Sequence, residues 1–136
     1  MKNFRTTTTI LVFSVLAFAC KKNHDDHGHA TPATTNIHII SPTVGQEIDH
    51  KDTAKIKCEI TSPSQLHGYT ITLTRLADTT VVYTDDVHTH QNNYSIIYNW
   101  VNNNTIHSDM LLTIDANIDH SGNKVSKSVQ FHAHYH

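Results

Sequence analysis

From about residue 37 onward, apolar and polar side chains alternate along short runs that are separated by turn-forming residues. In 54–61, for example, Ile56, Cys58 and Ile60 alternate with lysine and glutamate. A period of two is typical of strands that bury one face, and no segment of useful length has the period of a helix. The pattern predicts strands at 37–40, 54–61, 69–74, 81–87, 94–100, 110–116 and 125–135.

About seven strands in about 100 residues, separated by frequent turns, predict an all-β fold, an antiparallel sandwich of two sheets. Cys58 is expected in the core as a small apolar residue. Trp100 belongs to an aromatic stripe that is expected to face inward. In the last run, Phe131 and Tyr135 are expected to face inward as well.

Three stretches resemble bacterial immunoglobulin-like surface modules. Residues 39–45 are similar to the first strand of these modules, 114–123 to their penultimate strand and its Asp-x-x-Gly-Asn turn, and 125–131 to their final strand. The resemblance implies an immunoglobulin-like antiparallel β-sandwich over 37–136. It departs from antibody domains because the sequence offers no cysteine pair to bridge the sheets, and such modules host many functions.

The first 19 residues have the pattern of an export signal. Lys2 and Arg5 precede a short apolar run, 10–18, and Ala17 and Ala19 are small where a signal peptidase requires small residues. This run is too short to span about 30 Å of hydrocarbon as a helix. We therefore expect 1–19 to be a signal peptide that is removed.

Residues 16–20 (Leu-Ala-Phe-Ala-Cys) resemble the lipobox of bacterial lipoproteins. In that family the cysteine is lipidated and becomes the mature N-terminus, which here is Cys20. The resemblance implies a lipid-anchored protein of the cell envelope, at the outer membrane or cell surface of a Gram-negative bacterium. Leu16 stands one position early and Phe18 is bulky, so plain cleavage after Ala19 stays the alternative.

Residues 20–36 contain little from which a core can form, and we predict a flexible tether. Without 1–19, the chain has eight basic and twelve acidic residues and a net charge of −4 with neutral histidines. That charge does not favour nucleic acid, and no basic stripe with interleaved aromatic residues occurs.

Thirteen histidines, all after Cys20, make up roughly a tenth of the chain. Imidazole is the commonest protein ligand of borderline transition metals. Their number predicts a metal-binding protein with zinc, copper(II) or nickel as its ion. Met1 and Met110 are the only methionines, so a methionine-rich Cu(I) site is excluded.

Two of the histidine-rich segments lie before the last strand. His24, His27 and His29 surround two aspartates in the tether, where flexible ligands can wrap a divalent ion. In the second segment, Asp86, His88 and His90 share one parity. On an extended strand, residues two apart point to the same face about 6.6 Å apart, so the two imidazoles are expected to share an ion. The alternatives are a polar linker and a solvated loop.

The third segment is the C-terminus, where His132, His134 and His136 have the parity opposite to Phe131. If Phe131 faces the core, the three histidines form a ladder on the outer face, and neighbouring members are expected to chelate an ion. A merely polar outer face is the alternative, and chain ends fray.

The other histidines are isolated in the sequence, and each is expected to be an exposed polar residue, although loops could gather them at one end of the sandwich. They are His38, His50, His67, His107 and His120.

No glycine-rich phosphate loop, serine nucleophile elbow or pair of catalytic carboxylates occurs in the sequence. We therefore do not expect this protein to be an enzyme. The predicted function is capture or buffering of a divalent transition metal at the envelope. The alternative is a non-catalytic adhesion module that binds a glycan or protein through loop residues such as Tyr83, His107 and 102–104. Haem capture and acid sensing below about pH 6.5 are further alternatives.

Overall fold

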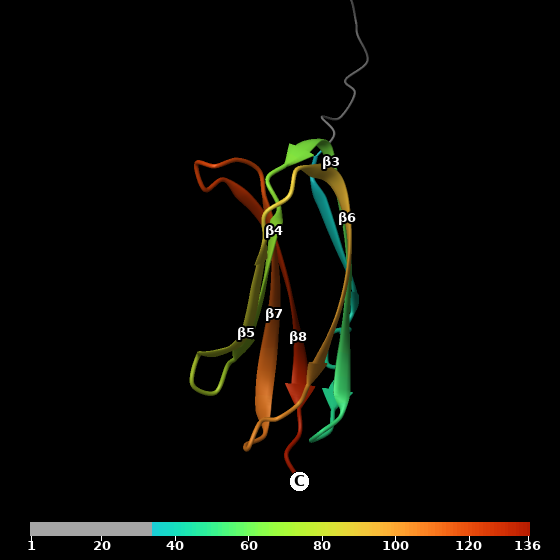
Figure 1. Ribbon diagram of the computed structural model, residues 1–136. Coiled ribbons are helices and arrows are strands. Elements are labelled where there is room, and N and C mark those ends of the chain that lie inside the picture. The colour runs from blue at the N-terminus through green and yellow to red at the C-terminus, as the bar shows by residue number, and fades with distance from the viewer. Residues whose placement is uncertain (1–33) are drawn as a thin grey trace, which may run out of the picture. The chain divides into compact units, whose positions relative to one another are not determined.

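The computed structural model describes residues 34–136, which form two β-sheets packed face to face (Figure 1). One sheet has the order β1-β3-β6 and contains β1 (Asn36–Ser41), β3 (Thr53–Leu66) and β6 (Gln91–Val101). The other has the order β2-β8-β7-β4-β5 and contains β2 (Glu47–Ile48), β4 (Tyr69–Arg75), β5 (Thr80–Val87), β7 (Ser108–Asn117) and β8 (Lys124–Ala133). The predicted antiparallel β-sandwich is confirmed, with the short β2–β8 pair as a parallel exception.

The path of the chain sends most connections to the two ends of the sandwich. The β3–β4, β5–β6 and β6–β7 connections each cross from one sheet to the other, whereas β4–β5 and β7–β8 are hairpins within one sheet. The β3–β4, β5–β6 and β7–β8 connections meet at one end. The β6–β7 connection and the C-terminus lie at the other end (Figure 1).

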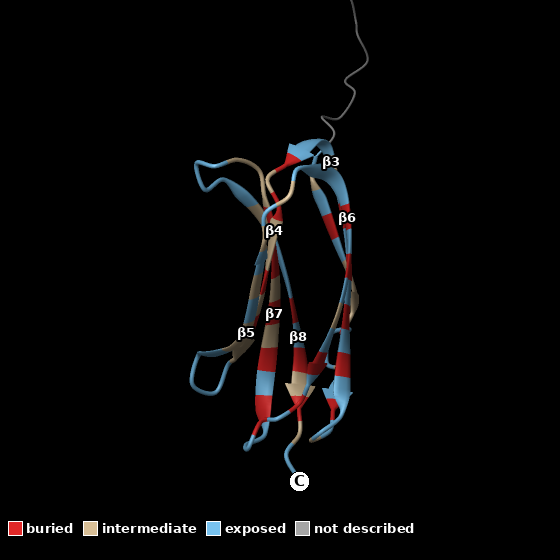
Figure 2. Ribbon diagram, in the orientation of Figure 1, coloured by how far each residue is buried: buried red, intermediate tan, exposed pale blue. Residues whose placement is uncertain are grey.

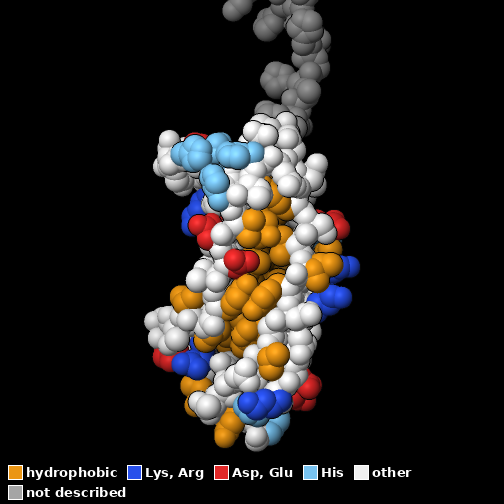
Figure 3. Space-filling model, in the orientation of Figure 1, with side chains coloured by type: hydrophobic (Ala, Val, Ile, Leu, Met, Phe, Trp, Pro, Cys, Tyr) orange, Lys and Arg blue, Asp and Glu red, His pale blue; other side chains and the backbone are white. Residues whose placement is uncertain are grey.

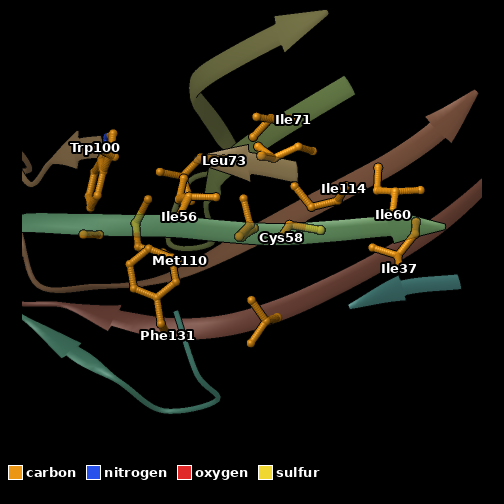
Figure 4. Close-up of a cluster of buried hydrophobic side chains, with 14 of the residues drawn as sticks. Ile37, Ile56, Cys58, Ile60, Ile71, Leu73, Trp100, Met110, Ile114 and Phe131 are labelled. Carbon is orange, nitrogen blue, oxygen red and sulfur yellow. The ribbon is translucent and has the colours of Figure 1, made fainter. Parts of the chain in front are cut away.

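The core lies between the sheets, where the inward residues of each strand meet (Figure 2). In β3, buried and exposed residues alternate from Thr53 to Thr61, as the sequence pattern predicts. Ile56, Cys58 and Ile60 pack against residues of the opposite sheet such as Ile114 (Figure 4). Both sheets and this core lie within Pro32–His136, so this unit has what a domain needs to fold alone.

Cys58 is the core residue that the alternation predicts. It is completely buried and forms no disulfide within residues 34–136. Burial, reinforced by the neighbouring Glu59 carboxylate, raises the pKa of its thiol to about 11. The thiol therefore stays protonated at neutral pH.

Several strand boundaries differ from the prediction. The sequence pattern did not indicate β2, because two residues are too few for a periodicity. β3 continues beyond residue 61 to Leu66, and residues 91–93 belong to β6. Tyr135 was expected to face inward, but it lies beyond the end of β8 and is 42% exposed.

The predicted signal peptide, Cys20 and the three tether histidines His24, His27 and His29 lie outside the described residues. Asn36, the last residue of the predicted tether, is the first residue of β1. Within residues 34–136, no helix has the length and apolar character that a membrane span requires.

Candidate metal sites

Four histidines from three connections lie together at one end of the sandwich. His67 belongs to the β3–β4 connection, His88 and His90 to the β5–β6 connection, and His120 to the β7–β8 turn. We call these four residues the loop-end group. One ring nitrogen from each of His67, His90 and His120 lies within 4.8 Å of the others. The ring centroid of His88 lies 5.1 Å from that of His90. Figure 3 shows histidine side chains in pale blue gathered at this end.

A close approach of two backbone segments brings these connections together. Gly68 has a φ of +119°, and a Cβ atom there would lie 1.9 Å from the carbonyl oxygen of Val87. Only glycine fits this position. The His67 amide also donates a hydrogen bond to the Asn117 carbonyl at 2.8 Å, and the Asn117 amide donates to the Gly68 carbonyl at 3.0 Å. His67 is thereby fixed to both the β5–β6 connection and β7.

The turn that carries His120 is organised by Asp119. Its Oδ1 accepts hydrogen bonds from the amides of Ser121 at 2.8 Å and Asn123 at 3.2 Å, and its Oδ2 accepts one from Asn123 Nδ2 at 2.6 Å. The side-chain hydrogen bond from Asn123 is the main cause that lowers the pKa of Asp119. The turn holds the His120 ring centroid 4.2 Å from that of His67.

His67 has the most unusual environment of the loop-end group. Its Nδ1 is buried and has no hydrogen-bond partner among the described residues. Burial, followed by the three neighbouring histidines, lowers the pKa of His67. A lower pKa favours the neutral imidazole, which is the form that binds a metal ion.

A second set of four histidines lies at the opposite end, and we call it the C-terminal group. His107 comes from the β6–β7 connection, His132 from the end of β8, and His134 and His136 from the residues after it. One ring nitrogen from each of His107, His132 and His134 lies within 4.8 Å of the others. The His136 ring centroid lies 5.5 Å from that of His134.

Backbone hydrogen bonds hold the end of β8 and the residue that follows it against β2 and the residue before β2. The His132 amide donates to the Gln46 carbonyl at 2.8 Å, and the His134 amide donates to the Ile48 carbonyl at 2.9 Å. The buried Asn102 side chain donates to the carbonyl of His134 at 2.8 Å and to that of Ile48 at 3.0 Å. The backbone is therefore held in place by hydrogen bonds as far as His134.

The C-terminal group differs from the loop-end group because carboxylates approach three of its rings. The pairs are His132 Nδ1 with Asp109 Oδ1 at 2.9 Å, His134 Nε2 with Glu47 Oε2 at 3.7 Å, and His136 Nε2 with Asp49 Oδ1 at 3.6 Å. A carboxylate on one ring nitrogen orients the imidazole and makes the other nitrogen a better metal ligand. The Asp109–His132 pair has the distance for this arrangement.

The structure brings some of the predicted site residues together and leaves others apart. His88 and His90 lie close, but the strand does not extend to them: β5 ends at Val87, as predicted, and both histidines lie in the loop that was the alternative. Asp86 remains on β5, where it accepts a hydrogen bond from Thr70 at 3.0 Å, and it belongs to neither group. His132, His134 and His136 lie on one side in succession, with the last two beyond the strand.

Sequence reasoning did not assign His67, His107 and His120 to a metal site, because each is isolated in the sequence. The signal that they share is their position in connections between predicted strands. Connections of a sandwich gather at its ends, and these histidines lie at both ends rather than at one. His38, exposed on β1, is in neither group.

Comparisons with known proteins add little to this picture. No protein-family model matches the chain, and no curated protein matches it. Among solved structures, the chain is similar to fibronectin(III)-like modules of Clostridium thermocellum CbhA, with 11% sequence identity and a TM-score of 0.47. The similarity covers 72% of this chain and 94% of that chain. It carries no information on ligands or partners.

Proposed function

We propose that this protein is a non-catalytic β-sandwich module that binds divalent transition metal ions, zinc, copper(II) or nickel, through its two histidine groups. The observation that carries the proposal is the convergence of three ring nitrogens within 4.8 Å at each end of the sandwich, from segments distant in sequence. Ligand nitrogens around a tetrahedral ion with bonds of 2.0 to 2.1 Å are about 3.3 Å apart. The observed limit of 4.8 Å is wider than this separation, so the side chains would rotate to bind a tetrahedral ion.

Unpartnered ring nitrogens support the same proposal. Buried polar atoms nearly always have a hydrogen-bond partner or a ligand. His50 Nδ1, which is in neither group, is buried without a hydrogen bond among the described residues. His67 Nδ1 and His134 Nε2 share this condition, and each belongs to one of the two groups, with the Glu47 carboxylate 3.7 Å from His134 Nε2. A metal ion at each end would give both atoms a partner.

Capture or buffering of metal at the cell envelope is the role that we propose for this binding. The lipobox-like residues before Cys20 support it, because a lipid on Cys20 would hold the module at the outer membrane or the cell surface. The tether histidines would add ligands of lower affinity, since flexible ligands lose entropy on binding. Replacement of Cys20 by serine is expected to move the protein out of the membrane fraction.

Isothermal titration calorimetry of residues 32–136 with Zn²⁺, Ni²⁺ and Cu²⁺ tests the proposal without the tether. We expect two ions per chain, removable by EDTA, with an affinity that falls as imidazoles protonate below about pH 6. The double variant His67→Ala/His120→Ala should lose one ion, and His107→Ala/His132→Ala should lose the other.

His38→Ala is the matched control, because it removes an exposed histidine from outside both groups and should leave both ions bound. No saturable binding at micromolar ion would overturn the metal proposal. The alternative function, a non-catalytic adhesion module that recognises a glycan or protein, would then be favoured by the sandwich architecture.

A further inference from the structure

Four strand edges are exposed to pairing in the described part of the chain, and three of them are protected. β1 is short and is interrupted by a register shift between Ile39 and Ser41, and Pro42 follows it. β2 has two residues. β5 has a register shift opposite Leu73 and Thr74 and carries two aspartates. Short length, bulges, proline and charge are the usual means by which proteins prevent strand addition.

The fourth edge, that of β6, is long, uncharged and free of proline, and its one register shift with β3 lies at its start, before Asn93. β6 pairs with β3 on one side, and no described strand pairs with its other side. Its register with β3 is unbroken from Asn93 to Val101. All eleven residues of the strand, Gln91–Val101, are uncharged and none is proline. Its outward face exposes Ile97 by 59% and Val101 by 41%.

An apolar stripe adjoins this edge on the open side of the sandwich, between β5 and β6. Tyr83 of β5 and Tyr98 of β6 stack there with ring centroids 4.1 Å apart, and both are only partly buried. A depression of about 320 Å³ lies beside the stripe, with Val82, Trp100 and Val101 as its apolar lining and Arg75, Asn103 and Asn104 as its polar lining. Figure 3 shows hydrophobic side chains in orange along this side.

We propose that β6 is the interface strand of a homodimer, in which β6 of a second copy pairs with it antiparallel. A two-fold axis makes such an interface self-complementary: residues before the axis meet residues after it, and only the residue on the axis meets itself. A charged strand would meet like charge in such a pair, whereas the neutral β6 meets a neutral strand. The same axis brings the two apolar stripes together and joins the two three-stranded sheets into one sheet.

The register follows from maximal overlap of the unbroken segment 93–101. Pairing this segment with itself places Asn93 opposite Val101 and Ser95 opposite Asn99. Ile97 then lies opposite Ile97 of the second copy, where directly opposed Cβ atoms are about 4.5 to 5.5 Å apart. Ile97 is therefore the residue most sensitive to a charge.

Sedimentation equilibrium of residues 32–136 in EDTA tests the dimer independently of metal binding. We expect a reversible monomer–dimer equilibrium between about 10 and about 500 µM, as for a small interface. Ile97→Lys and Ile97→Asp should each be monomeric, and an equimolar mixture of the two should dimerise again. Circular dichroism checks that both variants remain folded.

Val44→Lys is the matched control, because it adds the same charge at an apolar residue that is 83% exposed and lies outside β6. It should dimerise like the unmodified chain. A chain that stays monomeric over the whole concentration range would overturn the proposal, as would an Ile97→Lys variant that dimerises as well as Val44→Lys. Because EDTA is present throughout, neither result bears on the metal sites.

Discussion

At the scale of single residues, Asn102 links the stability of the sandwich to the position of the C-terminal group. Its side chain is fully buried and donates to the carbonyls of Ile48 and His134. Its Oδ1 accepts a hydrogen bond from the amide of Asn104 at 3.1 Å. One amide side chain thus satisfies three backbone groups from three segments, which explains why a polar residue is buried here.

Asn102→Ala is expected to leave these groups without partners and to lower the free energy of unfolding by about 2–4 kcal/mol. Because His134 loses one of its two backbone anchors and keeps only its bond to Ile48, zinc affinity of the C-terminal group should fall about tenfold, while the loop-end group still binds. Urea denaturation and calorimetry measure the two effects. Asn103→Ala is the control, because it removes an exposed neighbour whose side chain bonds only Lys51. An equal loss of stability and zinc affinity in this variant would contradict the role assigned to Asn102.

At the scale of elements, the loop-end group depends on how two crossing connections approach each other. Each crossing leaves one sheet and enters the other. Backbone hydrogen bonds to Asn117 fix the β3–β4 crossing on β7, and the contact between Gly68 and the Val87 carbonyl defines its distance from the β5–β6 crossing. Because His67 and His88 directly neighbour these two residues, the backbone contact sets the separation of the imidazoles.

Gly68→Ala should therefore weaken zinc binding by the loop-end group about 10-fold to 100-fold, because the added methyl group forces the connections apart. We also expect a loss of about 1–3 kcal/mol in stability. Titration of the variant with zinc measures the first effect. In the control Gly45→Ala, φ is also positive at +71°, but the added Cβ has nothing within 4 Å. Equal zinc affinities for the two variants would exclude the close approach as the cause.

At the scale of the whole molecule, a thiol and two phenol groups in or near the core make the stability of the fold sensitive to alkaline pH. Burial raises the pKa of Cys58 to about 11, and it also raises the pKa values of Tyr69 and Tyr83. In each case the folded state retains a proton that the unfolded chain releases at lower pH. Their contribution to stability is complete below the unfolded pKa and is lost as the pH rises toward the folded pKa.

The free energy of unfolding should therefore decrease from about pH 9 upward, where the unfolded thiol ionises, with a contribution from Cys58 of at most about 1.4 kcal/mol per pH unit. The tyrosines add to the slope above about pH 10. Urea denaturation at several pH values measures it. Cys58→Ala should be less stable at pH 7 because of the cavity, but its slope between pH 9 and 10 should be shallower. Identical slopes would contradict the assignment to Cys58.

The alternation of side chains predicted the long strands because each of them buries one face against a single core. Thus Ile56, Cys58 and Ile60 of β3 are buried, as are Met110 and Leu112 of β7. Two-residue β2 has no such pattern, and it forms because backbone groups near the end of β8 pair with it. The extension of β3 past Pro63 likewise depends on its partner strand rather than on side-chain period.

The sequence by itself determined that the described part of the chain is a sandwich of half-buried strands and that histidine is unusually frequent in it. Both are local properties, since a period of two and a composition need no knowledge of distant contacts. Tertiary structure alone decided which histidines meet. His67 and His120 are far apart along the chain, and their rings come within 4.2 Å because the sandwich brings its connections to a common end.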